Sequence, residues 1–217
     1  MGILDDIVLD SYQNTSEKNN KYAIIGISGL FPESESVDDF FNNLLRGKDF
    51  IRDFPEQRKN EVKKFGKKIS KKDKSYRHAA YLNDISGFDN EFFQISDAES
   101  RLIDPKQRLI LMTAYRAFED AGILDELSNT STGVFIGNSN MLNYKYFDII
   151  KTIRPDLVDI SGTGNMDSML SSRISYYFNL KGPSVVIDTA CSSSLFAVDQ
   201  AINSISCGEC DLALVGG

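Results

Sequence analysis

The sequence predicts an α/β fold in which helices are layered on a mostly parallel sheet. Short apolar runs typical of strands alternate with longer segments in which apolar residues recur every three or four positions. A chain of 217 residues with 41% hydrophobic composition can bury one substantial core, as one domain or as part of a larger one. The strand segments are 22–27, 133–137, 184–187 and 212–215, and the helical segments are 36–47, 104–121, 166–178 and a stretch that begins at 195.

Residues 1–20 differ from the rest of the chain. Apolar side chains recur at helical spacing between residues 3 and 12, and a polar stretch follows. We assign residues 1–20 to a leader or docking segment, because both a frayed end and a short docking helix for an upstream protein fit this pattern. Residues 21–217 form the domain, which opens with the apolar strand 22–27.

Two of the helical segments have clear ends. Ser36 is the expected N-cap of the first, with Asp39 three residues later and Gly47 at its end. Asp104 caps the second, Pro105 takes its first position and Gly122 ends it. The expected apolar faces consist of Val37, Phe40, Phe41, Leu44 and Leu45 for the first helix and of Leu109, Met112, Tyr115 and Ala121 for the second.

The segment 166–178 carries an apolar stripe that we interpret as core packing. A cofactor site is the alternative, but the glycines at 162 and 164 lack the preceding strand and the spacing of a dinucleotide-binding or phosphate-binding loop. The sequence therefore predicts no bound cofactor. The stripe consists of Met166, Met169, Leu170, Ile174, Tyr177 and Phe178.

The stretch 184–202 is the centre of the predicted fold. The β-branched run Ser184–Ile187 is typical of a strand buried on both faces, and a turn of small residues that contains Cys191 follows it. The unpaired N–H groups and partial positive charge at a helix N-terminus favour the thiolate form of a nearby cysteine. Turn geometry alone leaves two readings open, a nucleophile and a buried structural cysteine. The helix that follows is expected to pack through Leu195, Val198, Ile202 and Ile205.

Charge and composition exclude several classes of protein. The net charge of −7 argues against a nucleic-acid-binding protein, which presents positive charge to the phosphates. The sequence contains no apolar run of membrane-spanning length and begins with acidic residues instead of the basic end of a signal peptide. Three cysteines are too few for a disulfide scaffold and suit a reducing compartment. We therefore expect a soluble, cytoplasmic protein without membrane or nucleic-acid partners.

Two further patterns have a simple explanation. The lysine-rich run 61–77 is interpreted as a solvated loop, with a docking patch for an acidic partner as the alternative. Cys207 and Cys210 have the spacing of a metal site, but a zinc site needs two more ligands, and Cys191 and His78 do not suit that role. We expect structural thiols and no metal.

Several motifs in order along the chain resemble the β-ketoacyl synthases, and above all the ketosynthase domains of modular polyketide synthases. The resemblance covers about residues 21–217. The Asp-Thr-Ala-Cys-Ser-Ser-Ser-Leu segment at 188–195 is similar to the active-site signature of that family. The other matching segments are 23–32, 91–96, 104–109, 133–137, 172–176, 182–184 and 208–217.

This resemblance implies the first half of a thiolase-like fold and the activity of an acyltransferase. Cys191 would accept an acyl chain from the phosphopantetheine thioester of an acyl carrier protein. The complete domain would then catalyse decarboxylative Claisen condensation with a malonyl-type extender, in a polyketide or fatty-acid-like synthase. In the family, two histidines, a lysine and a second oxyanion donor lie beyond the position that matches Gly217.

The resemblance also implies the partners of the chain. These are an acyl carrier protein, the remaining half of the ketosynthase, other synthase domains and a second copy paired through the strand that precedes Cys191. The alternative is a catalytically silent or truncated ketosynthase fragment that acts only in dimerisation or assembly. Silent relatives usually replace the active cysteine, so the presence of Cys191 counts against that alternative. The acyl substrate and the extender unit are open at this point.

Overall fold

A three-stranded parallel sheet forms the centre of the computed structural model, which describes residues 21–60, 62, 76–139 and 145–217. The strands β1 (Thr132–Gly137), β2 (Ser184–Ile187) and β3 (Leu212–Gly216) are arranged in the order β2-β1-β3. Both neighbours run parallel to β1. The predicted α/β architecture and these three strands are confirmed. The leader and most of the basic loop lie outside the described residues.

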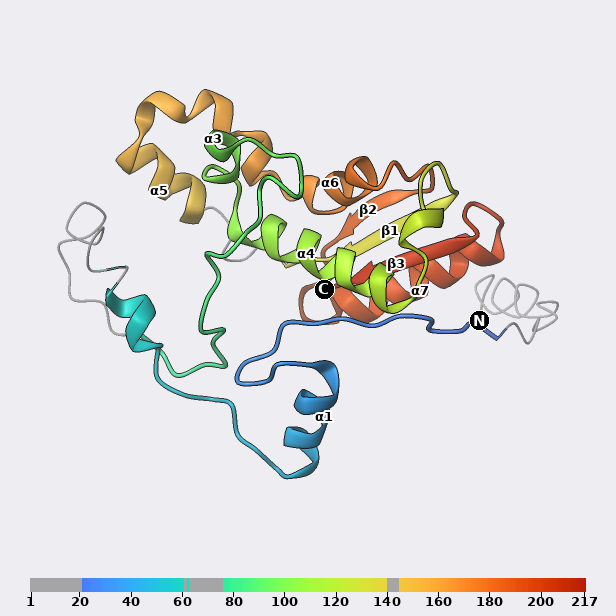
Figure 1. Cartoon of the computed structure of the whole chain (residues 1–217), viewed down its shortest axis with the longest axis horizontal. Helices are drawn as coiled ribbons and strands as arrows, with labels where there is room; N and C mark the ends of the chain where they lie inside the picture. Colours follow the sequence, from blue (N-terminus) through green and yellow to red (C-terminus); the bar gives the residue numbers. More distant parts are fainter. Residues whose placement is uncertain (1–20, 61, 63–75, 140–144) are drawn as a thin grey trace, which may run out of the picture.

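Helices cover both faces of the sheet, and Figure 1 shows α6 (Met169–Tyr177) and α7 (Ser193–Ser206) on opposite sides of it. Alternate side chains of β1 enter two separate clusters, as the two-residue period of a strand requires. Val134 and Ile136 pack with α6 and α4 (Pro105–Asp120), whereas Phe135 packs against α7. The result is a layered core with the sheet in the middle.

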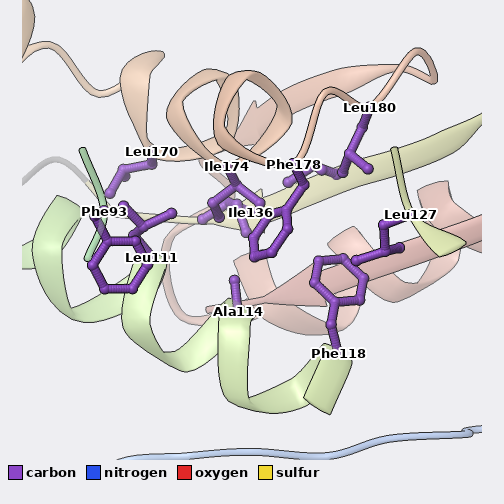
Figure 2. Packing of buried hydrophobic residues seen from close by; sticks show 11 residues of the cluster. Phe93, Leu111, Ala114, Phe118, Leu127, Ile136, Leu170, Ile174, Phe178 and Leu180 are labelled. Atoms are coloured by element: carbon purple, nitrogen blue, oxygen red, sulfur yellow. The ribbon is translucent and has the colours of Figure 1, made fainter. Parts of the chain in front are cut away.

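The larger cluster joins α4 and α6 over β1, as Figure 2 shows. Leu111, Ala114 and Phe118 form the buried face of α4, and the Phe118 and Phe178 rings meet with centroids 5.0 Å apart. The face predicted for α4 was therefore wrong. Apolar side chains occupy more than one side of this helix, and Met112 and Tyr115 pack only at the edge of the cluster.

The predicted helix ends are confirmed. In α1 (Val37–Leu45), the Ser36 hydroxyl accepts a hydrogen bond from the Asp39 N–H at 3.0 Å. The carboxylate of Asp104 accepts the Lys106 N–H at 2.8 Å at the start of α4. Gly47 and Gly122 follow the two helices with φ values of 68° and 70°, which glycine adopts without a steric penalty.

The apolar face predicted for α1 is only partly buried. Phe40 stacks on Phe31 with ring centroids 4.1 Å apart. Phe41, Leu44 and Leu45 are instead 58%, 48% and 71% exposed. The apolar stripe of this helix is wider than the surface that the described residues offer to it.

Helix α7 packs on the sheet through small residues, contrary to the prediction. Its sheet-facing side includes Ala197 and Ala201, whereas Leu195 and Val198 are 78% and 42% exposed. The predicted stripe of Leu195, Val198, Ile202 and Ile205 was wrong at its first two residues, because the helix approaches the sheet there too closely for large side chains. Ile205 does pack against the cluster that contains Ala197 and Ala201. The approach is closest at Gly137, where a Cβ atom would lie 2.7 Å from the Ser193 carbonyl carbon.

Two strand predictions need correction. Strand β2 lies at the edge of the described sheet, and Ser184 and Val185 are exposed, so it is not buried on both faces. Residues 22–27 form no strand, because no described strand pairs with them, and apolar β-branched composition alone does not make a ladder. The segment instead contacts α4, where the Ile27 N–H donates to the Asp120 carboxylate at 2.8 Å.

Short helices connect these elements. Within the described residues, no helix has both the length and the apolar character needed to cross a lipid bilayer. The connecting helices are α3 (Asp97–Ser100), η1 (Leu124–Glu126), α5 (Lys145–Ile153), η2 (Pro155–Leu157), η3 (Asp159–Ser161), η4 (Thr163–Asn165) and η5 (Ala190–Ser192).

Replacement of Gly137 by alanine tests the close approach of α7 to β1. The added Cβ would lie 2.7 Å from backbone atoms of both Ser193 and Ser194, so the start of α7 must move. We expect Gly137→Ala to lower the free energy of unfolding by about 1–3 kcal/mol in urea titrations.

Gly162→Ala is the matched control. Gly162 has helical torsions and no atom within 4 Å of the position of an added Cβ. We expect this variant to leave the unfolding free energy unchanged or to raise it by up to about 1 kcal/mol. Equal effects of the two substitutions would contradict the packing described here.

Candidate active site

Cys191 lies in a tight turn between a strand and a helix. Strand β2 ends at Ile187, the turn η5 contains Cys191, and α7 begins at Ser193. The thiol is exposed among the described residues, which argues against the alternative of a buried structural cysteine. The turn stands at the carboxyl edge of the parallel sheet, which is where ligands bind in open α/β folds. The prediction of a strand–turn–helix around Cys191 is confirmed.

The residue before Cys191 has a left-handed backbone. Ala190 has a φ of 55°, which is uncommon for a residue with a Cβ atom and costs about 1–2 kcal/mol. Such torsions persist where surrounding contacts enforce them, and they gather at active sites and ligand-binding segments. Sharp turns of this kind present nucleophiles at the start of a helix. The positive φ of Ala190 lies between the end of β2 and Cys191.

Three of the hydrogen bonds in the turn are made by the side chains of Asp188 and Ser193. The Ala190 N–H donates to Asp188 Oδ1 at 3.0 Å, and the Thr189 N–H donates to Ser193 Oγ at 2.9 Å. The Ser193 hydroxyl in turn donates to the Ala190 carbonyl at 2.7 Å. A hydrogen bond contributes roughly 0.5–1.5 kcal/mol net, so three such bonds suffice to offset the cost of the left-handed residue.

The amide of Cys191 lies within η5, between the amides of Ala190 and Ser192. The amides of Thr189, Ala190 and Ser192 donate to Ser193 Oγ, Asp188 Oδ1 and the Thr189 carbonyl. A backbone N–H beside a nucleophile is a common oxyanion donor in acyl transfer. The turn therefore presents a thiol and a hydrogen-bond donor together.

A polar group that sequence reasoning missed lies at the same edge of the sheet. Lys106 Nζ lies 3.4 Å from Asn138 Oδ1 and 3.3 Å from Asp167 Oδ1. Asn138 follows β1, and its N–H donates to the Ile187 carbonyl at 2.9 Å, just before the turn. These three residues are far apart in the sequence, so no local pattern brings them together.

Gln107 ties the start of α4 to the segment before α6. Its amide nitrogen donates to the carbonyls of Thr163 and Met166 at 3.2 and 3.1 Å, and its oxygen accepts from Arg173 Nε at 3.1 Å. Met166 itself is 54% exposed and lies before the first turn of α6. The predicted stripe thus contributes Leu170, Ile174 and Phe178 to the core, whereas Met166 lies outside it.

The remaining cysteines and the histidine lie in other surroundings. Cys207 is the exposed C-cap of α7, and Cys210 is buried with its Sγ 3.6 Å from Ser204 Oγ. His78 is exposed, with its Nε2 2.9 Å from Asp53 Oδ1. Among the described residues, no group of three or more His, Cys, Asp or Glu side chains could hold a metal ion.

Comparison with known proteins identifies relatives across almost the whole chain. Residues 19–217 match the family model of the β-ketoacyl synthase N-terminal domain. Polyketide synthase PksN of Bacillus subtilis is 39% identical over 197 residues, which are 90% of this chain and 4% of that protein. Orsellinic acid synthase of Beauveria bassiana is 35% identical over 213 residues, which are 95% of this chain and 9% of that protein. The chain thus spans less than a tenth of these relatives.

Solved structures agree with this result. The ketosynthase from module 6 of the bacillaene synthase of Bacillus subtilis superposes with a TM-score of 0.68 at 33% identity, over 89% of this chain and 30% of that one. Ketosynthase twelve from the bacillaene synthase of Bacillus amyloliquefaciens gives a TM-score of 0.71 at 31% identity, over 89% and 32% of the two chains. These neighbours confirm the thiolase-like fold class. The chain therefore belongs to the β-ketoacyl synthase family, as the N-terminal part of a polyketide synthase ketosynthase.

Proposed function

We propose that Cys191 is the nucleophile that receives an acyl chain from the phosphopantetheine thioester of an acyl carrier protein. The observation that carries this proposal is the exposed thiol beside a left-handed residue at the carboxyl edge of the sheet. The phosphopantetheine arrives with the carrier protein as part of the substrate, so the chain needs no resident cofactor for this step.

The acyl transfer uses two groups of the turn, the thiolate and the N–H of Cys191. The Cys191 thiolate attacks the thioester carbonyl carbon, and the new carbon–sulfur bond forms a tetrahedral intermediate. The negative charge develops on the carbonyl oxygen, where the Cys191 N–H can donate to it. The intermediate collapses with loss of the phosphopantetheine thiolate, which takes a proton from solvent. The acyl chain is then held as a thioester on Cys191.

The condensation step needs groups beyond those of this chain. Decarboxylation of a malonyl-type extender produces an enolate, and the family resemblance assigns its stabilisation to two histidines. This chain contains one histidine, His78, which is exposed and paired with Asp53. We therefore propose that residues 1–217 carry the acylation step and that decarboxylative condensation belongs to the complete ketosynthase domain.

Strand β2 is proposed as the pairing surface of a homodimer. The Pro183 carbonyl accepts from the Val134 N–H of β1 at 2.7 Å, and the Ile187 carbonyl accepts from the N–H of Asn138, just after β1, at 2.9 Å. In a parallel ladder alternate residues face opposite sides, so the N–H groups of Ser184 and Val186 are directed to the free edge. An exposed edge of this kind is a template for a second strand. Pairing of two copies through β2 would place their two turns close to the interface.

Mass spectrometry of the chain with two substrates tests the division of the chemistry. When the chain is incubated with an acyl carrier-protein thioester and a malonyl carrier protein, we expect an acyl adduct on Cys191 and no β-ketoacyl product. Loss of a single oxyanion donor commonly lowers the rate by roughly 10²- to 10³-fold, and here two histidines are missing as well.

Cys191→Ala is the control, and it should form no adduct. Absence of an adduct on the unsubstituted, folded chain would refute the proposed acylation and favour an assembly role for it. A condensation product above the Cys191→Ala background would show that the machinery of the second step lies within residues 1–217.

Competition between the two exposed cysteines tests the reactivity of Cys191. Cys191 lies before the N-terminus of α7 and Cys207 caps its C-terminus, so the dipole of the same helix acts on them in opposite directions. We expect limiting iodoacetamide to alkylate Cys191 roughly tenfold faster than Cys207. Peptide mapping measures both rates, and Cys210 is protected by burial. In urea the alkylation rates of the three cysteines should converge. A folded chain alkylated first at Cys207 would contradict the proposal that Cys191 is the nucleophile.

Sedimentation of a β2 variant tests the proposed dimer. Ser184→Pro removes an outward-facing donor from the edge without touching the ladder to β1. We expect the unsubstituted chain to sediment as a dimer or larger assembly at micromolar concentration, and Ser184→Pro to raise the dissociation constant about tenfold. Ser184→Ala keeps the N–H and should associate normally. A monomeric unsubstituted chain would rule out the β2 pairing.

A further inference from the structure

We propose that Ser193 is a positioning residue that holds Ala190 in its left-handed conformation and thereby sets the direction of Cys191. This inference rests on the proposed function of Cys191 as the acyl acceptor. Ser193 itself touches no reacting atom. Its role is to act on the backbone that carries the nucleophile.

The Ser193 hydroxyl connects both sides of the left-handed residue. It accepts from the Thr189 N–H at 2.9 Å and donates to the Ala190 carbonyl at 2.7 Å. The torsions that lie between those two backbone groups include the φ of Ala190, which is 55°. Rotation of Ala190 towards a right-handed conformation would therefore separate the hydroxyl from its partners.

The position of Ser193 is in turn fixed by the sheet. The residue is 5% exposed, and its carbonyl carbon would lie 2.7 Å from a Cβ atom at position 137. Because Gly137 has no side chain, the first residue of α7 contacts the backbone of β1 directly. Ser193 therefore contacts the sheet through its backbone and the turn through its hydroxyl, so that a shift of the sheet would also shift the turn.

Neighbouring serines do not share this arrangement. The Ser192 hydroxyl donates to the Thr189 carbonyl at 2.8 Å, on the strand side of the turn only. For Ser194, none of the hydrogen bonds found among the described residues uses the hydroxyl, and the side chain is exposed. Ser194→Ala is therefore a matched control for Ser193→Ala, with the same atoms removed one residue away.

Acylation and alkylation of Cys191 respond differently to its orientation. Alkylation by iodoacetamide needs a thiolate, whereas acyl transfer also needs the Cys191 N–H to face the carbonyl oxygen. A misplaced catalytic group costs roughly 10- to 100-fold in rate. We expect Ser193→Ala to lower the rate of acylation by that factor and the rate of alkylation by less than about threefold. Ser194→Ala should change neither rate.

A double variant separates positioning from a general loss of structure. Glycine adopts a positive φ without a steric penalty. In Ala190→Gly, residue 190 therefore no longer needs the hydrogen bonds of Ser193 to keep its left-handed conformation. We expect Ser193→Ala combined with Ala190→Gly to recover most of the acylation rate. Acylation that stays as low as in Ser193→Ala, or an equal loss in Ser194→Ala, would overturn the proposal.

Amide hydrogen exchange tests the hydrogen bonds of the Ser193 hydroxyl independently of the proposed function. Ser193→Ala removes the acceptor of the Thr189 N–H, so this amide should exchange at least about tenfold faster than in Ser194→Ala. Failure of the unsubstituted chain to form an acyl adduct would refute the acyl-acceptor role of Cys191, but amide exchange at Thr189 would still test Ser193. An unchanged exchange rate at Thr189 in Ser193→Ala would refute the positioning role of Ser193.

Discussion

The contact between Gly137 of β1 and the start of α7 is the constraint on which the rest of the structure depends. A parallel sheet needs a helix close to its face, and backbone-to-backbone contact is possible only where a side chain is missing. This contact fixes the position of Ser193. The sharp turn before Ser193 and the exposure of Cys191 depend on that position. The core supports the candidate nucleophile through this close approach and through that of Gly217, where a Cβ atom would lie 2.8 Å from Ser194 Cβ.

The same constraint explains why the amphipathic pattern of α7 is misleading. A helix that lies close to a sheet must present alanine and serine to it, so Ala197 and Ala201 are buried while Leu195 is exposed. Leu195 and Val198 therefore lie on the outer side of this helix, whereas Ile205 packs at the edge of the cluster on the sheet. Helix α1 shows a similar feature, with Phe41 and Leu45 exposed. Both helices carry more apolar surface than the described residues cover.

Local strain and local hydrogen bonding balance each other at the turn. Ala190 occupies a conformation that an L-residue rarely adopts, and the polar side chains of the surrounding segment compensate for it. A segment rich in serine and threonine is suited to this role because each hydroxyl can donate and accept at once. The small polar residues around Cys191 thus have a structural role in the turn.

The sequence by itself determined the α/β class, the three strands, the ends of α1 and α4 and the position of Cys191 between a strand and a helix. These features follow from local signals: apolar runs, caps such as Asp104 with Pro105, and the motif around the cysteine. The family followed from several motifs in the right order.

Only the tertiary structure decided which helix faces are buried, which strand lies at the edge and how the turn is held. Burial depends on how closely two elements approach, and that distance is set by residues such as Gly137 and Ser193, which lie on different elements. Residues 22–27 read as a strand, but a strand exists only where a neighbour completes its ladder. Likewise, Lys106, Asn138 and Asp167 meet because separate chain segments end at one edge of the sheet, and no local pattern encodes that meeting.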